Sequence, residues 1–538
     1  MLLLDLRKTN GPLYRRVYHA LKSTIREGRL APDARLPSTR ELAADLRVSR
    51  NTVVLAYEQL LAEGYLVGRN RATASVASTL PTSARPAASR SKENPPPVSA
   101  YARRLTALLG TPSTRSSRAG LRYDFRYGEP SLDEFPREIW RRLLAARARR
   151  PARDAFGYAD PTGYPPLREA LTEYLKRARG VLCEADQIVI TSGSQQGFDL
   201  AARVLLDPGD VAVVEEPHYP GVTIPFEAGG ARLAHTPVDG EGLQTQRLPS
   251  RARVAYVTPC HQFPTGVIMP LERRLALLAW AARADSWVIE DDYVSEFRYE
   301  GHPLEALQSL DRDGRVIYVG TFSKTLFPAL RVGYVVLPRP LVPSFVAAKW
   351  ATDRFSATLA QEALMDFITT GQFERYLRRA GNRNATKRRV LIGALRQHFG
   401  DRVEIAGENT GVHLVVWLND VRPRDLAAVI GRARAAGVGL YSVAPFYASP
   451  PPRAGLLFGY ASLTETEIRA GIRRLREVVQ RAPRERVSGR RTPQSARAAT
   501  RRFSATVASS GPRFASDRRS SPRPGCSPSR HRRARGRE

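Results

Sequence analysis

Short apolar runs alternate with amphipathic helical stretches over most of this chain, from Leu121 to about residue 480. Runs that are apolar on both faces belong in a sheet that is covered on both sides, and helices between consecutive runs supply the connections of parallel strands. The alternation therefore predicts an α/β domain over residues 121–480, with a largely parallel sheet flanked by helices. The runs are Gln187-Ile-Val-Ile, Val211-Ala-Val-Val, Val254-Ala-Tyr-Val, Trp287-Val-Ile-Glu and Val316-Ile-Tyr-Val.

The rest of the chain divides into three segments of different composition. Residues 11–77 read as a compact helical unit followed by a short hairpin. Residues 78–120 are rich in Pro, Ser and Ala and are interpreted as a linker. Residues 481–538 contain Arg, Ser, Pro and Ala without an apolar period, so we expect a disordered tail there.

The charge balance indicates a polyanionic partner. Lys and Arg number 84 against 52 Asp and Glu, a net charge of +32. The tail holds 17 Arg and 3 acidic residues, so +14 belongs to the tail and +18 to the other 480 residues. A basic surface suits nucleic acid, but 77 of the 84 cations are Arg, which a GC-rich coding sequence explains equally well.

Cysteine content and hydropathy exclude several other classes. The three cysteines, Cys183, Cys260 and Cys526, form no CxxC pair and are too few for a disulfide framework or a four-cysteine zinc site, so no metal site is expected. No 18 apolar residues run together, and the N-terminus lacks a basic signal segment. We therefore expect a cytoplasmic protein.

Two helix starts stand close together in the N-terminal unit. Ser38 and Glu41 have the spacing of a capping box, and Ser49 is a suitable N-cap for a second helix that ends at Gly64. Two short helices joined by a tight turn predict a helix-turn-helix. The candidate DNA contacts are Ser49, Arg50, Asn51 and Thr52 on the first turn of the second helix, and Arg40 at the start of the preceding helix.

Polar residues are common at any helix start, so each candidate alone is weak evidence, but the combined motif is specific. Leu36-Pro-Ser-Thr-Arg-Glu-Leu-Ala, Val48-Ser-Arg-Asn-Thr-Val and Tyr57-Glu-Gln-Leu-Leu-Ala-Glu-Gly resemble the winged helix-turn-helix of the GntR family of bacterial regulators. The resemblance covers residues 11–77 and implies double-stranded DNA as a partner. The family's Gly-x-Gly-Thr wing turn is replaced here by Gly68-Arg-Asn-Arg-Ala-Thr, where Arg69 and Arg71 are candidates to substitute as phosphate contacts.

Lysine is scarce in this chain, and Lys324 follows the last of the apolar runs. A lysine among apolar residues loses solvation, which lowers its pKa and frees its amine to condense with an aldehyde. Thr321, Ser323 and Arg331 surround it with groups that bind an anion. A buried structural lysine paired with an acid is the alternative for Lys324 alone.

Two further stretches favour a binding site over that alternative. Asp291 and Tyr293 follow an apolar strand and point the same way on an extended chain, while Asp292 points the opposite way. Ser194 and Gln195 open a helix after a Gly/Ser turn, a common place for a phosphate. An acidic strand end facing water and a plain strand-to-helix turn remain possible interpretations of these stretches.

Together these motifs resemble the fold-type I pyridoxal-phosphate enzymes of the aspartate aminotransferase class, over residues 121–480, with a small C-terminal α+β subdomain. The resemblance implies pyridoxal 5'-phosphate as the cofactor and a homodimer with shared sites. Lys324 corresponds to the lysine that forms the Schiff base, Asp291 to the partner of the pyridine nitrogen and Tyr293 to the donor to the phenolic oxygen. The phosphate cup corresponds to Ser194, Gln195, Thr321, Ser323 and Arg331, the stacking aromatic to Tyr219, and Tyr158 to the tyrosine that reaches the neighbouring subunit's phosphate.

Two positions depart from that class. Phe263 stands where such enzymes have the asparagine of Asn-Pro-x-Gly, so one hydrogen bond to the ring oxygen is lost or comes from His261 or Gln262. In Arg453-Ala-Gly-Leu-Leu-Phe-Gly-Tyr a leucine takes the place of the arginine that grips a substrate α-carboxylate. Ordinary transamination of α-amino acids is therefore in doubt.

A GntR-type reader joined to an aminotransferase-like domain resembles the MocR family of regulators. Phe125-Arg-Tyr-Gly-Glu-Pro-Ser-Leu, His261-Gln-Phe-Pro-Thr-Gly and Ile289-Glu-Asp-Asp-Tyr-Val-Ser-Glu-Phe carry the resemblance. It implies a transcriptional regulator that senses pyridoxal phosphate or an amino compound. The rival hypotheses are an active aminotransferase with an appended DNA-binding domain, and a basic protein that binds DNA without sequence preference.

Overall fold

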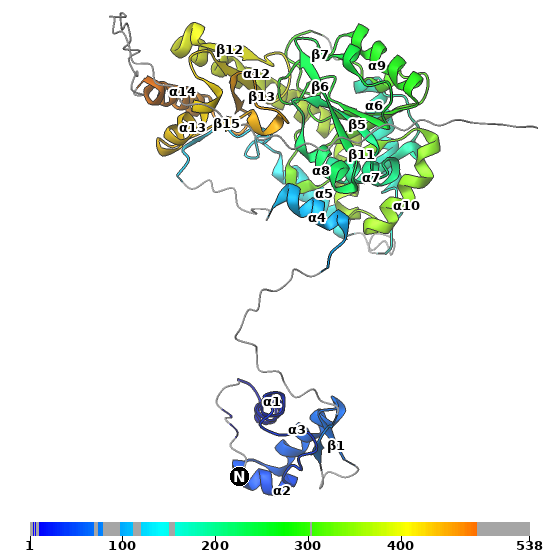
Figure 1. Cartoon of the computed structure of the whole chain (residues 1–538), viewed down its shortest axis with the longest axis vertical. Helices are drawn as coiled ribbons and strands as arrows, with labels where there is room; N and C mark the ends of the chain where they lie inside the picture. The colour runs from blue at the N-terminus through cyan, green and yellow to red at the C-terminus, as the bar shows by residue number, and fades with distance from the viewer. Residues whose placement is uncertain are drawn as a thin grey trace, which may run out of the picture. The chain divides into compact units, whose positions relative to one another are not determined.

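The computed structural model describes residues 4, 6, 10–68, 74–78, 97–110, 120–149, 157–301 and 304–480. The predicted tail and the turn of the predicted wing, with Arg69 and Arg71, lie outside these residues. Figure 1 shows the elements along the chain. No helix in the described part is long and apolar enough to cross a membrane.

The N-terminal unit is a three-helix domain closed by a two-stranded antiparallel ribbon. Ser38 caps its second helix in a full capping box with Glu41, and Ser49 caps the third, as the sequence predicted. Val17, Leu21, Val53, Tyr57 and Leu60 fill a core of its own. Its elements are α1 (Leu13–Arg26), α2 (Thr39–Leu46), α3 (Arg50–Ala62), β1 (Leu66–Val67) and β2 (Ser75–Val76).

An eight-stranded sheet forms the centre of the large domain, in the order β4-β11-β10-β9-β8-β5-β6-β7. Neighbouring strands from β10 to β6 are parallel, while β11 and β7 run antiparallel to their neighbours. This mainly parallel sheet confirms the predicted fold class. The strands are β4 (Ile188–Thr191), β5 (Val211–Glu216), β6 (Arg232–Asp239), β7 (Gly242–Leu243), β8 (Val254–Val257), β9 (Trp287–Asp292), β10 (Val316–Thr321) and β11 (Gly333–Val336).

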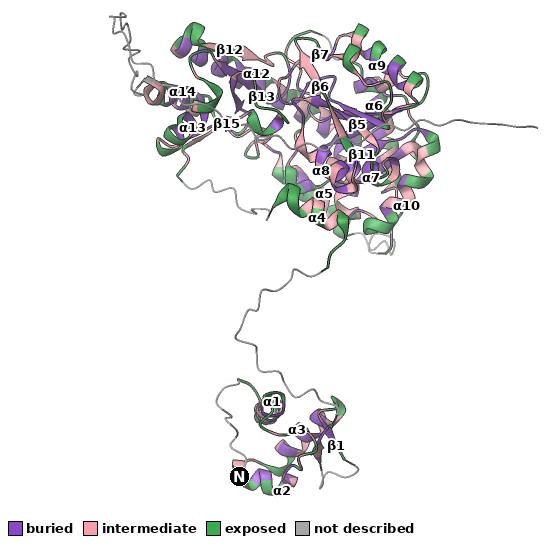
Figure 2. Cartoon of the chain, in the orientation of Figure 1, coloured by how far each residue is buried: buried purple, intermediate pink, exposed green. Residues whose placement is uncertain are grey.

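Helices cover both faces of this sheet because successive side chains of each strand point to opposite sides. On β10, Ile317 and Val319 join one apolar cluster, whereas Tyr318 joins another. Figure 2 shows the buried residues concentrated in the central strands, with exposed residues on the outer helices. The helices are α5 (Arg137–Arg149), α6 (Pro165–Arg179), α7 (Ser194–Leu205), α8 (Pro220–Gly229), α9 (Leu271–Ala284), α10 (Val342–Asp353), α11 (Thr358–Thr369) and the long α12 (Gln372–Phe399).

A smaller α+β subdomain completes the large domain. Its antiparallel sheet has the order β12-β13-β16-β15, and a parallel pair joins β14 to β3. Helices α12 and α14 pack against it around Leu391, Leu414, Phe458 and Ile472. The remaining elements are β3 (Tyr123–Asp124), β12 (Val403–Ala406), β13 (His413–Leu418), α13 (Leu426–Ala435), β14 (Val438–Gly439), β15 (Tyr441–Ser442), β16 (Ala454–Gly459) and α14 (Glu465–Gln480).

Of the predicted linker at residues 78–120, only residues 78, 97–110 and 120 lie in the described part, and there the structure differs from the prediction. Residues Ala100–Leu109 form a helix, α4, which Ser99 caps. Arg104 Nε donates a 2.9 Å hydrogen bond to the carbonyl of Ala228 on α8. The Pro- and Ser-rich composition of the flanking residues concealed this short helix, which contacts α8 although none of its residues is fully buried.

Candidate functional site

A cavity of about 210 Å³ lies where several strands of the central sheet end. The strand register explains its position, because the ends of β9 and β10 are level: Gly320 pairs with Asp292, and Thr321 with Gly333, which in turn pairs with Thr191. Fifteen residues line the cavity: Tyr127, Gly128, Ser194, Gln195, Tyr219, Phe263, Asp291, Tyr293, Thr321, Ser323, Lys324, Pro328, Arg331, Val412 and His413. Of the ten residues that the resemblance assigned to the cofactor, all except Tyr158 are among them.

Asp291 is the buried acid of the cavity. Its Oδ2 accepts a 2.7 Å hydrogen bond from the hydroxyl of Tyr256, while its Oδ1 is buried without a partner among the described residues. Burial raises the pKa of Asp291 to about 7, against the opposing effects of the Tyr256 hydrogen bond and the Lys324 charge. The hydroxyl of Tyr293 is also buried and unpaired in the described structure. A ligand that brings a donor to Asp291 and an acceptor to Tyr293 satisfies both groups.

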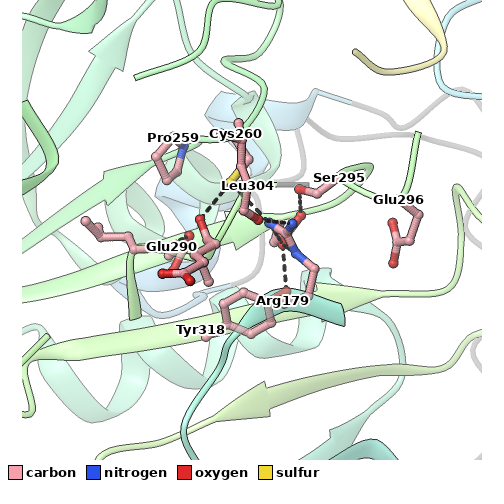
Figure 3. A network of polar contacts seen from close by, with 12 residues as sticks. Arg179, Pro259, Cys260, Glu290, Ser295, Glu296, Leu304 and Tyr318 are labelled. Carbon is pink, nitrogen blue, oxygen red and sulfur yellow. Dashed lines mark hydrogen bonds and ion pairs between the residues drawn. The ribbon is translucent and has the colours of Figure 1, made fainter. Parts of the chain in front are cut away.

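Asp292 points to the other side of the sheet, as strand alternation predicts. There its Oδ2 accepts 2.7 Å hydrogen bonds from Arg179 Nε and from the hydroxyl of Tyr318. Burial alone would raise the pKa of Asp292, but the Arg179 guanidinium holds it below its ordinary value. Figure 3 shows Arg179 inside this network, where it also contacts Cys260 and the carbonyl of Leu304. The network fixes the end of β9 and so the direction in which Asp291 points.

Lys324 projects from the loop after β10. Its Nζ donates a 2.9 Å hydrogen bond to the carbonyl of Gly128, and a side chain at Gly128 would meet that Nζ at 2.7 Å. Burial lowers the pKa of Lys324, while the charge of Asp291 opposes the shift. The amine of Lys324 is therefore more readily neutral than that of an exposed lysine, and condensation with an aldehyde requires the neutral amine.

A second part of the cavity lining, the anion end around Arg331, carries groups that bind an anion. Ser194 begins α7, whose N-terminal amides and dipole favour negative charge. The hydroxyls of Thr321 and Ser323 lie 3.1 Å apart, and Arg331 donates to the carbonyl of Ser192. A side chain at Gly193 would approach the Arg331 guanidinium to 2.9 Å, so the turn needs glycine for the arginine to reach this position.

Aromatic rings form the remaining wall. Tyr219 packs edge-on against Phe263 at 5.5 Å between ring centroids, and Phe263 packs in the same way against Phe446 at 4.9 Å. Leu457 is fully buried in this cluster. Lys324 and Arg331 are the only lysine and arginine among the described residues that line the cavity.

Four residues singled out from the sequence lie away from the cavity. Arg453 bonds to Glu404 and Asn419 on the surface, and His261 Nδ1 contacts the hydroxyl of Thr410 at 2.5 Å. The Gln262 amide is occupied by Glu215 and by the carbonyls of Pro217 and Phe263. Neither His261 nor Gln262 is among the residues that line the cavity. Tyr158 is 84% exposed and packs on Phe355.

Sequence reasoning missed Tyr127, Gly128, Tyr256 and His413. His413 begins β13, and its Nε2 lies 3.0 Å from the carbonyl of Pro264. Burial lowers the pKa of His413 to about 4. Tyr256 could have been found from the sequence, because it lies on the predicted parallel strand next to that of Asp291. His413 could not, because it comes from a distant segment that carries no motif.

In the N-terminal domain, Arg40, Ser49, Arg50 and Asn51 are exposed, and Thr52 is half-buried. Arg50 Nε lies 3.4 Å from the hydroxyl of Thr39, which joins the start of α3 to the start of α2. The hydroxyls of Ser49 and Thr52 lie 2.7 Å apart. Thus the candidate DNA contacts gather around the N-terminus of α3.

Comparison with known proteins assigns both parts of the chain. The family described as "Aminotransferase class I and II" matches residues 125–475, and "Bacterial regulatory proteins, gntR family" matches residues 13–76. Pyrococcus horikoshii kynurenine aminotransferase, solved with pyridoxamine phosphate, aligns with a TM-score of 0.62 and 30% identity over 72% of this chain and 96% of its own. The large domain is therefore a class I/II, fold-type I aminotransferase domain, and its cofactor is pyridoxal phosphate.

Relatives of nearly full length share both domains. The probable rhizopine catabolism regulatory protein MocR of Rhizobium meliloti is 38% identical over 88% of this chain and 95% of its own length. The regulator TauR of Rhodobacter capsulatus is 33% identical over 86% of this chain and 96% of its own. This chain belongs to the MocR-type transcriptional regulators, in which a GntR-type helix-turn-helix precedes an aminotransferase-like domain.

Proposed function

We propose that this regulator holds pyridoxal phosphate through Lys324. In this proposal an amino compound, or pyridoxal phosphate itself, changes how the protein binds DNA. Pyridoxal phosphate supplies an aldehyde that condenses with primary amines. The residues present fit that group, because the unpaired oxygens of Asp291 and Tyr293 and the anion end around Arg331 line one cavity with the Lys324 amine.

Each group has one role in this proposal. Asp291 would keep a ring nitrogen protonated, and Tyr293 would donate to the ring's phenolic oxygen. The phosphate would be held by Ser194, Gln195, Thr321, Ser323 and Arg331, while Tyr219 would cover the ring. The lowered pKa of Lys324 makes its amine available for exchange with an incoming amine.

One observation favours the sensor hypothesis over the enzyme hypothesis: the described lining of the cavity has no additional cation that would bind a substrate α-carboxylate. Beyond Lys324 and Arg331, no arginine or lysine of the described chain lines the cavity, and Leu457 belongs to the aromatic cluster beside it. An α-carboxylate placed against that wall would lose its hydration without gaining a cation. We therefore propose an effector without an α-carboxylate, and no requirement for transaminase turnover.

Tyr158 supports a homodimer as the working form. It is 84% exposed, beside Arg354, whose guanidinium lies 5.2 Å from the Tyr158 ring centroid. In the proposed dimer it reaches the cofactor phosphate of the other subunit, and two DNA-binding domains then act together in the cytoplasm. The proposed dimer has two states, one that favours and one that disfavours binding to paired DNA sites. The effector acts by binding these two states with different affinities.

The first experiment is to incubate the purified protein, loaded with pyridoxal phosphate, with fragmented DNA from its source at physiological salt and to sequence what is retained. A discrete site with two half-sites near a gene cluster is the expected result. Retention without sequence preference, steeply reduced by salt, would instead support the non-specific binding hypothesis.

A second experiment separates sensing from catalysis. Paired ligands, an α-amino acid and the amine left by its decarboxylation, are titrated against the cofactor's absorbance, and α-keto acid formation is followed in parallel. We expect the amine to bind as tightly as the amino acid or more tightly, without turnover. Sustained transamination of an amino acid with a keto acid would favour the enzyme hypothesis.

A further inference from the structure

We propose that Glu216, His218 and His235 form a binding site for a divalent d-block metal ion, of which Zn²⁺ is the natural probe. The site lies on β5 and β6 and on the loop after β5, and none of its three residues lines the cofactor cavity. It goes beyond the proposed function and does not depend on it.

The sheet topology brings the three residues together. Glu216 is the last residue of β5, His218 follows two residues later, and His235 lies on the parallel neighbour β6. The register pairs Val214 with His235. No spacing motif in the sequence reports this cluster, because His235 is separated from the other two by the whole of α8.

The distances suit a shared metal ion. Glu216 Oε2 lies 3.2 Å from His235 Nδ1 and 3.7 Å from His218 Nδ1, and one ligand atom from each residue falls within 4.8 Å of the others. In a tetrahedral zinc site, bonds of about 2.0–2.2 Å place neighbouring ligand atoms roughly 3.3–3.6 Å apart. A metal ion therefore fits with small side-chain adjustments.

The second observation is that two of the three ligand atoms are buried without a hydrogen bond in the described structure. Glu216 Oε1 accepts hydrogen bonds from the amides of Ala448 at 2.8 Å and Ser449 at 3.1 Å, so Oε2 is the oxygen that lies near the two histidines. Glu216 Oε2 and His218 Nδ1 are buried without a hydrogen-bond partner among the described residues, and His218 is only 7% exposed. Buried polar atoms of this kind call for a partner, and a metal ion satisfies both at once.

The donor set indicates the kind of metal. Two imidazoles and one carboxylate are the protein ligands of many zinc sites that keep a fourth position open. Two imidazole nitrogens disfavour Mg²⁺ and Ca²⁺, which prefer oxygen ligands. The His235 side chain is 28% exposed, so solvent and the ion have access from its side.

A metal ion here would join two parts of the chain beside the cofactor. The amide of His218 donates a 2.9 Å hydrogen bond to the carbonyl of Phe446, and Glu216 holds the amides of Ala448 and Ser449. The next residue after His218 is Tyr219, which lines the cavity. Metal binding therefore fastens the segment from Phe446 to Ser449 to the end of β5, against the aromatic wall.

The test uses the full-length protein, stripped of metal with a chelator and then titrated with Zn²⁺ in competition with a chromophoric chelator. We expect one Zn²⁺ per chain bound at this site. His235→Ala, at the most accessible ligand, and Glu216→Gln, which keeps the hydrogen bonds of Oε1, should each weaken binding by at least about a hundredfold, more than is usual for residues behind the ligands. His19→Ala, an exposed histidine of the N-terminal domain, is the matched control and should bind Zn²⁺ like the wild type.

Hydrogen–deuterium exchange supplies a second readout. Zn²⁺ should slow exchange of the Ala448 and Ser449 amides in the wild type and leave it unchanged in His235→Ala. Wild-type protein that binds no Zn²⁺ stoichiometrically, or a His235→Ala variant that binds it as tightly as the wild type while both remain folded, would overturn the proposal.

Discussion

The hydroxyl of Tyr256 lies 2.7 Å from Oδ2 of Asp291 and holds one oxygen of this carboxylate, while the other oxygen is left buried and unpaired among the described residues. The two residues come from the neighbouring parallel strands β8 and β9, so the sheet register sets the hydrogen bond. Tyr256 thus lowers the pKa of an acid that burial raises, and favours the charged form that a protonated pyridine ring needs.

Tyr256→Phe should weaken pyridoxal phosphate binding by about 1–2 kcal/mol, roughly fivefold to thirtyfold, because a hydrogen bond to a charged group is lost. Titration of the cofactor-free protein, followed by absorbance, measures the change. Tyr318→Phe is the matched control, since it removes the same kind of bond from Asp292 on the opposite side of the sheet. That variant should lower the free energy of unfolding with little effect on the cofactor; equal losses of affinity in both variants would contradict a specific role for Tyr256.

Lys324→Ala should abolish covalent retention of the cofactor after borohydride reduction, because it removes the only lysine that lines the cavity among the described residues. Mass spectrometry of the reduced, denatured protein measures the retention. Lys349→Met is the control: Lys349 is fully buried but pairs with Asp353 at 2.6 Å and does not line the cavity. Cofactor found attached to Lys324→Ala would reassign the lysine.

The sequence predicted the parts of the site that depend on local geometry. Strand alternation separated Asp291 from Asp292, and the capping signals of Ser38 and Ser49 located the two helices of the DNA-binding motif. These features depend on neighbours within a few residues, where the chain's periodicity fixes direction.

Features that depend on contacts between distant segments were not predicted. His413 reaches the cavity from β13, because the small subdomain's sheet presents it there. The helix Ala100–Leu109 was missed because it lies in a Pro- and Ser-rich segment, and its contact with α8 comes from a distant part of the chain. The cluster of Glu216 and His235 likewise exists only through the pairing of β5 with β6.

Burial makes the stability of the cofactor-free protein depend on pH. The pKa of Asp291 is raised to about 7 in the folded chain from about 3.8, so between these values the folded state holds a proton that the unfolded state has lost. Stability contributed by this group therefore falls as pH rises from about 4 to 7. Asp291→Asn lacks this titrating carboxyl group. The free energy of unfolding of the variant minus that of the wild type should therefore rise by about 1–3 kcal/mol between about pH 4 and 7, and stay level above pH 8.

Urea unfolding of the cofactor-free proteins at a series of pH values measures that difference. Glu215 is a useful comparison, because burial raises its pKa to about 7 as well, and Glu215→Gln should show a trend of the same sign. A difference between Asp291→Asn and the wild type that does not change with pH would mean that Asp291 keeps an ordinary pKa in the folded chain.

In the helix-turn-helix, substitutions of Arg50 on α3 and Arg40 on α2 are expected to distinguish two kinds of DNA contact. Arg50 is exposed on the first turn of α3, where a recognition helix meets base edges, and its Nε lies 3.4 Å from the Thr39 hydroxyl, which holds the side chain near the start of α2. Arg50→Ala should weaken binding to the retained site by about 1–3 kcal/mol and reduce discrimination against mutated sites, as the loss of a base contact does.

Arg40→Ala, if Arg40 meets only phosphate, should weaken binding to all sequences equally and reduce the salt dependence by about one ion. Fluorescence anisotropy with specific and scrambled duplexes over a range of salt concentrations distinguishes these outcomes, with Arg26→Ala at the end of α1 as the control; equal loss on both duplexes for Arg50→Ala would make Arg50 a phosphate contact.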